Sequence, residues 1–263
     1  MKPSVGQQWI AALKEESVRA PILDARAYRH YGKVPAWWQR VYDLRQLAPG
    51  SRILEIGSGS GNQLLPLAVQ GFAVTGLDVS PDALEYCQKI IVALAKFYHR
   101  PMPVSLLLDD VMQMQPTEQF ALVFSFGVIE HFLDRAERLA VLRKMCECTK
   151  PGGVCVNVVP NGMHSWRRAT RENKLGGYNI PEIDYGLASL RAEMLEAGYA
   201  TARVIPLDLF GYRLVCAPRR NLTWTFFRGL NLLFKIVPQR WLSLAFCERH
   251  AYLLASVAVK NPQ

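Results

Sequence analysis

Short apolar runs alternate with amphipathic stretches through most of the chain. The runs have the length and the Val, Ile and Leu content of buried strands, whereas the stretches repeat apolar residues at helical spacing. The runs predict strands at 52–57, 73–78, 103–108, 120–125 and 153–159. The stretches predict helices near 62–70, 81–97, 134–148 and 187–197. This alternation indicates an α/β fold, in which helices cover both faces of a parallel sheet.

Residues 1–49 precede the alternation and have the pattern of amphipathic helices, with Trp9 on an apolar face. We expect them to form a helical lid. One interpretation is that the lid only packs its aromatic side chains on the core. The other is that Tyr28 or Tyr31 closes over a bound ligand.

A basic, apolar insert at 208–249 separates two further expected strands at 201–207 and 251–259. Its apolar residues recur at helical spacing, and the helix should stop at Pro238. The polar strip expected on this helix is Asn221, Trp224, Arg228, Asn231 and Lys235. The apolar face opposite this strip would suit a lid on the protein's own core, a homodimer contact, or peripheral contact with a membrane through 219–246.

Three alternate glycines join the first strand to the first helix in the segment 53–62, which reads ILEIGSGSGN. Glycine backbone lets a ligand approach closely, and the first N–H groups of a helix can point at it. Asn62 replaces the last glycine of a dinucleotide fingerprint, and the Lys and Ser or Thr of a phosphate loop are absent after Gly61. The turn therefore predicts a ligand site of neither of these classes.

Asp78 ends the second expected strand, close to the spacing of about 20 residues at which an acidic side chain meets a ribose diol in α/β nucleotide sites. The neighbouring strand ends beside the glycine turn, so a carboxylate there can accept from both hydroxyls. Capping the next helix is the alternative role. Ser80 already suits that role, which favours ribose binding.

Several segments resemble, in type, order and spacing, the motifs of class I S-adenosylmethionine-dependent methyltransferases. They are E-x-G-x-G-x-G at 55–61, Asp78, FALVFSFGVIEHF at 120–132 and KPGG at 150–153. Ala121 departs from the pattern, because the family usually has Asp there. The resemblance covers roughly half the chain. It implies a seven-stranded Rossmann-like sheet with an antiparallel final pair of strands.

The resemblance also implies S-adenosylmethionine as cofactor, with S-adenosylhomocysteine as product, and an acidic contact to the adenine amino group from Asp109 or Asp110, of which the register favours Asp110. The expected cofactor-binding residues are Tyr31, Glu55, Gly57, Ser58, Gly59, Gly61, Asn62, Gln63, Asp78, Val79, Asp109, Asp110, Val111, Phe126, Gly127, Val128 and His131.

The expected substrate contacts gather on the lid and on a long irregular segment, 160–186, that follows the fifth strand at the edge where α/β sheets bind ligands. They are Tyr28 and Tyr31 on the lid and His164, Tyr178 and Tyr185 on this segment, to which Glu130, after the fourth strand, is added. His131 and His164 are the candidate catalytic bases, since histidine accepts a proton near neutral pH. A packing role for His131 at the start of the next helix is the alternative.

Composition narrows the class of protein less than the motifs do. Half of the residues are apolar, so a sizeable core can form. The formal charge of +9 suits an anionic partner or a membrane surface, but no Lys/Arg run favours nucleic acid. Six cysteines without a C-x-x-C pair predict no metal site and reduced thiols, as in the cytoplasm. The N-terminus lacks the apolar core of a signal peptide.

The domain organisation expected is a lid at 1–49 and a methyltransferase domain at 50–263, which contains the loop 160–186 and the insert. The function expected is transfer of a methyl group to an oxygen, nitrogen or carbon of a small-molecule or lipid-like acceptor. A membrane-peripheral enzyme with a lipid-linked acceptor is a narrower version of it. A non-catalytic protein that binds the cofactor or its product is the alternative from another class.

Overall fold

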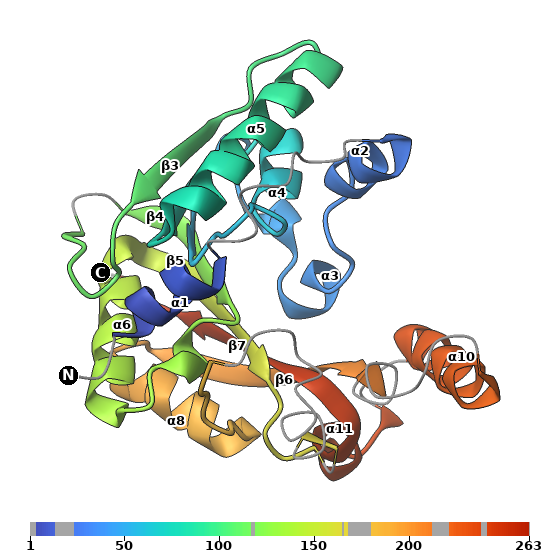
Figure 1. Ribbon diagram of the computed structural model, residues 1–263. Helices are drawn as coiled ribbons and strands as arrows, with labels where there is room; N and C mark the ends of the chain where they lie inside the picture. Colours follow the sequence, from blue (N-terminus) through green and yellow to red (C-terminus); the bar gives the residue numbers. More distant parts are fainter. Residues whose placement is uncertain are drawn as a thin grey trace.

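The computed structural model describes residues 4–13, 24–116, 119–164, 166–167, 180–211, 221–237 and 241–262. Its centre is a seven-stranded sheet with the order β3-β2-β1-β4-β5-β7-β6 (Figure 1). The strands are β1 (Arg52–Ile56), β2 (Ala73–Asp78), β3 (Val104–Leu108), β4 (Phe120–Phe126), β5 (Thr149–Pro160), β6 (Thr201–Leu209) and β7 (Ala251–Val259). The sequence-based prediction of a seven-stranded Rossmann-like sheet is confirmed.

The first five strands are parallel, and β7 lies antiparallel between β5 and β6. Parallel strands direct their carboxyl ends to the same edge, so the segments that follow β1 to β4 meet there. Successive side chains of β1 face opposite layers: Ile53 packs into one core cluster, and Leu54 and Ile56 pack into the other.

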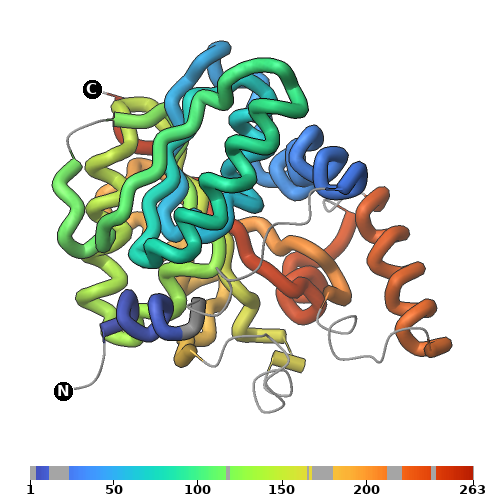
Figure 2. Tube along the Cα trace, turned by 45° about the horizontal axis from the view of Figure 1, so that its top comes forward, coloured from blue at the N-terminus to red at the C-terminus, as the bar shows by residue number. Residues whose placement is uncertain are grey.

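Helices cover both faces of the sheet (Figures 1 and 2). The cluster that contains Ile53 is completed by Trp38 of α3 (Trp38–Val41) and by Leu67 and Ala68 of α4 (Leu65–Val69), and α5 (Pro81–Phe97) packs beside α4. The cluster that contains Leu54 is completed by α6 (Arg135–Cys148) and α8 (Leu187–Glu196).

The segment 1–49 contains helices, as expected, namely α1 (Val5–Leu13), α2 (Ala25–Tyr31), α3 and the short η1 (Leu44–Gln46). They attach at different places. The α1 helix contacts α5, and α2 contacts α4. The ring of Tyr28 in α2 also stacks on Phe97 at the end of α5, with 4.0 Å between the ring centroids.

The helix predicted near 134–148 is present as α6, but Glu130 and His131 do not lie at its start as expected. Glu130 and His131 lie in a separate 3-10 helix, η2 (Ile129–His131), and the long helix begins only at Arg135. The reason is a cap: Asp134 Oδ1 accepts hydrogen bonds from the backbone N–H of Ala136, at 2.8 Å, and of Glu137, at 3.1 Å. Glu130 and His131 are therefore placed by a turn after β4.

The insert forms α10 (Leu222–Ile236) and α11 (Leu244–His250), and α10 ends before Pro238 as predicted. The polar strip expected on α10 was wrong at Asn231. This side chain is buried, and its Nδ2 donates to Asp208 Oδ1 at 2.8 Å and to the Leu209 carbonyl at 2.6 Å. Arg228 and Lys235 of the same strip are exposed, so within the strip it is Asn231 that faces the body of the protein instead of water.

A buried ion pair ties α6 to α8. Arg138 Nη2 donates to Glu193 Oε1 at 2.9 Å, and Tyr185 Oη donates to Glu193 Oε2 at 2.5 Å. Arg138 Nη1 also donates to the carbonyls of Phe132 and Leu133. Arg138, Glu193 and Tyr185 are all buried, so their charges and polar atoms depend on one another for partners.

We predict that Arg138→Met and Glu193→Leu each destabilise the protein by about 3 kcal/mol, because each leaves the other charge buried and unpaired. The double variant should lose clearly less than the sum of the two losses. Urea unfolding measures all three variants. Glu196→Gln, which breaks the exposed pair with Arg135, is the control and should change stability little. Additive losses in the double variant would contradict this account.

Candidate functional site

A cavity of about 430 Å³ lies at the carboxyl ends of β1, β2 and β4. Its volume is within the usual range of small-molecule sites. Its lining comes from the turns after these strands, from the segment after β3, and from α1. The lining residues are Val5, Gly6, Trp9, Glu55, Ile56, Gly57, Ser58, Gly59, Ser60, Asn62, Gln63, Leu77, Asp78, Val79, Asp110, Val111, Phe126, Gly127, Val128 and Phe132.

The glycine turn after β1 forms the floor of the cavity. Gly57 has a φ of +69°, and a Cβ there would lie 2.5 Å from Val128 Cγ2. Gly59 has a φ of +49°, and a Cβ there would meet no atom within 4 Å, because the cavity opens beside it. Glycine is therefore required at 57 for backbone conformation and space, and at 59 for conformation. Gly61 packs against Cys87 and Leu65 and does not line the cavity.

Asp78 connects the end of β2 to this turn. Its Oδ2 accepts from the Gly59 N–H at 2.7 Å, and its Oδ1 accepts from the Ser80 N–H at 2.9 Å. The side chain is buried and lines the cavity. Burial raises its pKa, and the backbone hydrogen bonds from Ser80 and Gly59 oppose that rise. Each carboxyl oxygen keeps a lone pair for a ligand hydroxyl.

Two buried oxygens at the cavity wall have no hydrogen-bond partner among the described residues. They are Glu55 Oε2 and Ser58 Oγ. Burial raises the pKa of Glu55 well above its ordinary value, and the negative charge of Asp78 adds to the rise. Buried polar atoms normally find partners, so a polar ligand group in the cavity would satisfy these two.

The structure separates the two adjacent aspartates after β3. Asp110 lines the cavity, and its Oδ1 accepts from the Met112 N–H at 2.9 Å. Asp109 is exposed, and its Oδ1 accepts from the Asp110 N–H at 2.8 Å. Asp110, the residue that the register favoured, is therefore the one that lines the cavity.

The sequence analysis missed the contribution of α1. Trp9 and Gly6 line the cavity, and a Cβ at Gly6 would lie 3.5 Å from Val79 Cγ1 and 3.6 Å from Asp110 Oδ2. The missing side chain therefore lets α1 approach the rim closely. Amphipathic spacing indicated a packed helix at this position, but not the surface on which it packs.

The tyrosines expected to close over the ligand lie farther out. Tyr31 is buried among α4 and α5, its Oη donates to Asn62 Oδ1 at 3.2 Å, and burial raises its pKa to about 12. It therefore supports a lining residue without lining the cavity itself. The ring of Tyr28 stacks on Phe97 and does not line the cavity. Trp37 is closer to the site, since its Nε1 donates to Gln63 Oε1 at 3.1 Å.

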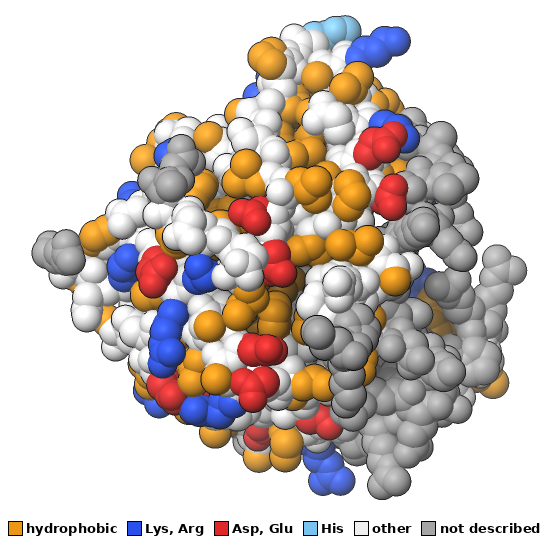
Figure 3. Space-filling model, turned by 60° about the vertical axis from the view of Figure 1, so that its left-hand side comes forward, with side chains coloured by type: hydrophobic (Ala, Val, Ile, Leu, Met, Phe, Trp, Pro, Cys, Tyr) orange, Lys and Arg blue, Asp and Glu red, His pale blue; other side chains and the backbone are white. Residues whose placement is uncertain are grey.

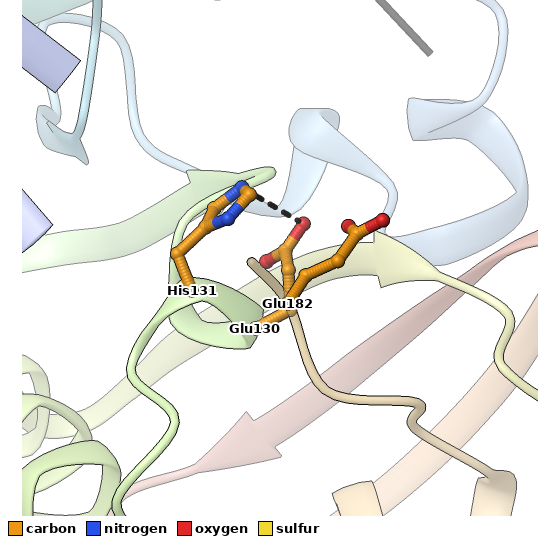
Figure 4. A group of neighbouring side chains, drawn as sticks. All are labelled: Glu130, His131 and Glu182. Carbon is orange, nitrogen blue, oxygen red and sulfur yellow. Dashed lines mark ion pairs between the residues drawn. The ribbon is translucent and has the colours of Figure 1, made fainter. Parts of the chain in front are cut away.

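Glu130, His131 and Glu182 form a cluster next to the cavity (Figure 4). His131 Nε2 lies 4.0 Å from Glu130 Oε1, and three donor atoms of the cluster lie within 4.8 Å of one another. Glu182 forms an ion pair with Arg167. The cluster has the donor types of a metal site, which the sequence did not predict, but Arg167 already balances the charge of Glu182.

Burial decides the protonation of this cluster. It raises the pKa of Glu130 to about 8 and lowers the pKa of His131. His131 Nδ1 lies 3.0 Å from the Pro181 carbonyl, which only accepts, so Nδ1 carries the hydrogen and Nε2 is the basic nitrogen. The ring does not line the cavity, but it contacts Trp9, which does, at 5.1 Å between ring centroids.

The candidates on the segment 160–186 are dispersed. His164 is buried outside the cavity, and its Nδ1 accepts from the Trp166 N–H at 3.0 Å. Tyr185 is buried in a core cluster, and its hydroxyl donates to Glu193. It is therefore not on the loop surface where a substrate was expected. Tyr178 lies outside the described residues.

Comparison with known proteins finds methyltransferases among the relatives of this chain. Residues 53–153 match a family model described as a methyltransferase domain. The ubiquinone biosynthesis O-methyltransferase of Paramagnetospirillum magneticum is 28% identical over 59% of this chain and 66% of its own length. The tRNA U34 carboxymethyltransferase of Hydrogenovibrio crunogenus is 32% identical over 45% of this chain and 35% of its own length. The chain thus spans less than two thirds of these relatives.

A solved structure shares the fold over the whole chain. It is phosphoethanolamine N-methyltransferase 2 of Haemonchus contortus in complex with S-adenosyl-L-methionine, with a TM-score of 0.60 and 15% identity over 100% of this chain and 61% of that one. The residues of the cavity fit that cofactor: a glycine turn, a carboxylate at the end of β2 and another after β3, and two buried oxygens for which the described part of the chain offers no partner. Residues 53–153 thus belong to the methyltransferase domain family, and the chain has the Rossmann-like fold of an S-adenosylmethionine-dependent methyltransferase.

Proposed function

We propose that this protein transfers a methyl group from S-adenosylmethionine to an oxygen, nitrogen or carbon of a small-molecule or lipid-like acceptor. The observation that carries the proposal is the cavity, in which the glycine turn, Asp78 and Asp110 lie together at the strand ends. When bound, the cofactor supplies an electrophilic methyl group, so the chain mainly has to orient two reactants and accept a proton.

The proposed roles follow from position. Asp78 holds the ribose hydroxyls, Asp110 selects the adenine, and the turn at 57–61 lets the cofactor approach the backbone. Ala121 does not enter the site: it is buried in β4 and does not line the cavity. The departure from the family pattern at this position therefore gives no support to a non-catalytic binding protein.

His131 is the proposed proton acceptor. Its lowered pKa keeps the ring neutral at neutral pH, and the Pro181 carbonyl fixes the hydrogen on Nδ1. The free Nε2 can then take a proton. His164 is the less favoured base, because its Nδ1 already accepts from Trp166, whereas His131 contacts Trp9 of the cavity wall.

A lipid-like acceptor would bring a second partner. Peripheral contact with a membrane through 219–246 is the form that such a partner would take, and we include it in the proposal. It is supported by the basic and apolar composition of the insert. A homodimer contact through the same helix is the competing proposal.

We predict that Asp78→Ala weakens binding of S-adenosylhomocysteine about 10- to 100-fold, the usual loss for hydrogen bonds to a charged group. Isothermal titration calorimetry measures the affinity. Asp109→Ala is the matched control, since Asp109 is exposed and outside the cavity, and it should bind normally. Unchanged affinity in Asp78→Ala, with the thermal midpoint preserved, would contradict the assignment.

We predict that His131→Gln lowers kcat about 100-fold while the affinity for S-adenosylhomocysteine stays within twofold. The assay measures S-adenosylhomocysteine release with a panel of phenol, amine and quinol acceptors. In the unmodified protein, kcat should fall with acid through a pKa below 6.5, because the ring must be neutral. The exposed His30, changed to Gln, is the control. A pH profile that survives in His131→Gln would exclude His131 as the base.

We predict that Glu130 makes stability fall as pH rises from about 5 to 8. Unfolded, its carboxyl loses the proton near 4.5, whereas the folded protein holds the proton up to about 8. The folded state therefore binds more protons in this interval, and raising the pH favours unfolding. Urea unfolding of Glu130→Gln should show a flatter pH dependence than the unmodified protein. Parallel curves for the two proteins would refute this titration.

A further inference from the structure

The side of α10 that faces away from the protein is apolar and exposed. Leu222 and Ile236, at its two ends, are 90% and 82% exposed, and Phe226, Leu232 and Leu233 lie between them with more than half of each side chain exposed. These five residues fall within one side of the helix, with Gly229 among them. We call this side the outer face of α10.

The outer face is not needed for the protein's own core. The opposite side of α10 carries Phe227, Leu230 and Phe234, which pack with α11 and Phe210 in a small separate cluster. Asn231 secures that side through its hydrogen bonds to Asp208 and Leu209. A lid on the core, one of the three roles that the sequence left open for this helix, would therefore involve the inner side alone.

Charge points to the partner of the outer face. From residue 209 to residue 247 the sequence has no acidic residue and contains Arg213, Arg219, Arg220, Arg228, Lys235 and Arg240. Of these, Arg228 and Lys235 are described, both are exposed, and both lie along one border of the outer face. By contrast, acidic and basic side chains lie near one another on the face shown in Figure 3.

We propose that the outer face of α10 docks on the surface of an anionic lipid bilayer, with the axis of the helix parallel to the membrane. Figures 1 and 2 both show α10 at the edge of the molecule, where a flat surface can reach it. Apolar side chains enter the headgroup region, and the flanking Arg228 and Lys235 meet lipid phosphates. Arg228 also lies 5.0 Å over the ring of Trp224, an aromatic residue typical of this depth.

A second copy of the chain is a poorer partner for this face. A symmetric dimer through α10 would bring two strongly basic inserts together, and they would repel each other. An anionic bilayer would attract the same insert. Insertion across the bilayer is not what we propose, since the described part of the chain has no helix long and apolar enough to span a membrane.

The docking helix is connected to the cofactor cavity. Arg40 of α3 donates from Nη2 to the carbonyls of Phe234, at 3.1 Å, and of Lys235, at the C-terminal end of α10. Three residues earlier, Trp37 donates to Gln63 in the cavity wall. Docking would thus hold this side of the cavity near the bilayer. The inference deepens the proposed function by naming the lipid surface, and only the lipid-like nature of the acceptor rests on that function.

Vesicle flotation of the full chain tests the docking without cofactor or acceptor. The protein should float with vesicles of phosphatidylglycerol and phosphatidylcholine, much less with phosphatidylcholine alone, and less as salt is raised. The outer-face variant Leu222→Ser, Phe226→Ser, Ile236→Ser should bind the anionic vesicles about tenfold more weakly or worse. Because all three side chains are exposed, its thermal midpoint should be preserved.

The control removes three exposed apolar side chains elsewhere, through Val92→Ser, Leu108→Ser and Leu133→Ser, each of which is more than half exposed, and it should float like the unmodified protein. Equal loss in the control, or full binding by the outer-face variant, would overturn the proposal. So would a dimer in sedimentation velocity that the outer-face variant dissociates. Binding of S-adenosylhomocysteine, measured in parallel, shows separately whether the cofactor assignment holds.

Discussion

The hydrogen bond from the Gly59 N–H to Asp78 Oδ2, at 2.7 Å, joins the two strand ends on which the site depends. It requires that β1 and β2 end side by side and that the turn after β1 has a positive φ. Together with the N–H of Ser80, it provides hydrogen-bond partners for the Asp78 carboxylate, which is buried in the cavity wall. The geometry of the cofactor site is thus a consequence of parallel strands that end at one edge.

Burial shifts the protonation of the acidic and imidazole side chains at and next to the cavity. Glu55 and Glu130 are enclosed in the protein and hold their protons more tightly than ordinary glutamates, whereas His131 holds its proton less tightly. At and next to the cavity, then, burial favours the protonated form of these two acids and the neutral form of the imidazole. Such a surrounding suits a reaction in which the acceptor has to lose a proton and the donor has to lose its positive charge.

The insert has its own small core and its own exposed surface. Phe227, Leu230 and Phe234 pack against α11 and Phe210 on the inner side of α10. The apolar side chains of the outer face take no part in this packing. The bond from Arg40 to the end of α10 fastens this surface to the segment that also carries Trp37. The outer face of α10 and the cavity are in this way connected through the segment that contains Trp37 and Arg40.

The sequence by itself determined the elements, because each strand and helix of the sheet has a local apolar period, and it determined the glycine turn and Asp78, because spacing along parallel strands fixes where their ends meet. Tertiary structure alone decided the rest. Trp9 reaches the cavity, and Tyr185 turns inward to Glu193, through contacts between segments distant in sequence. Asn231 lies inward for the same reason: a periodic pattern shows that a helix has two sides, but only packing selects the side that is buried.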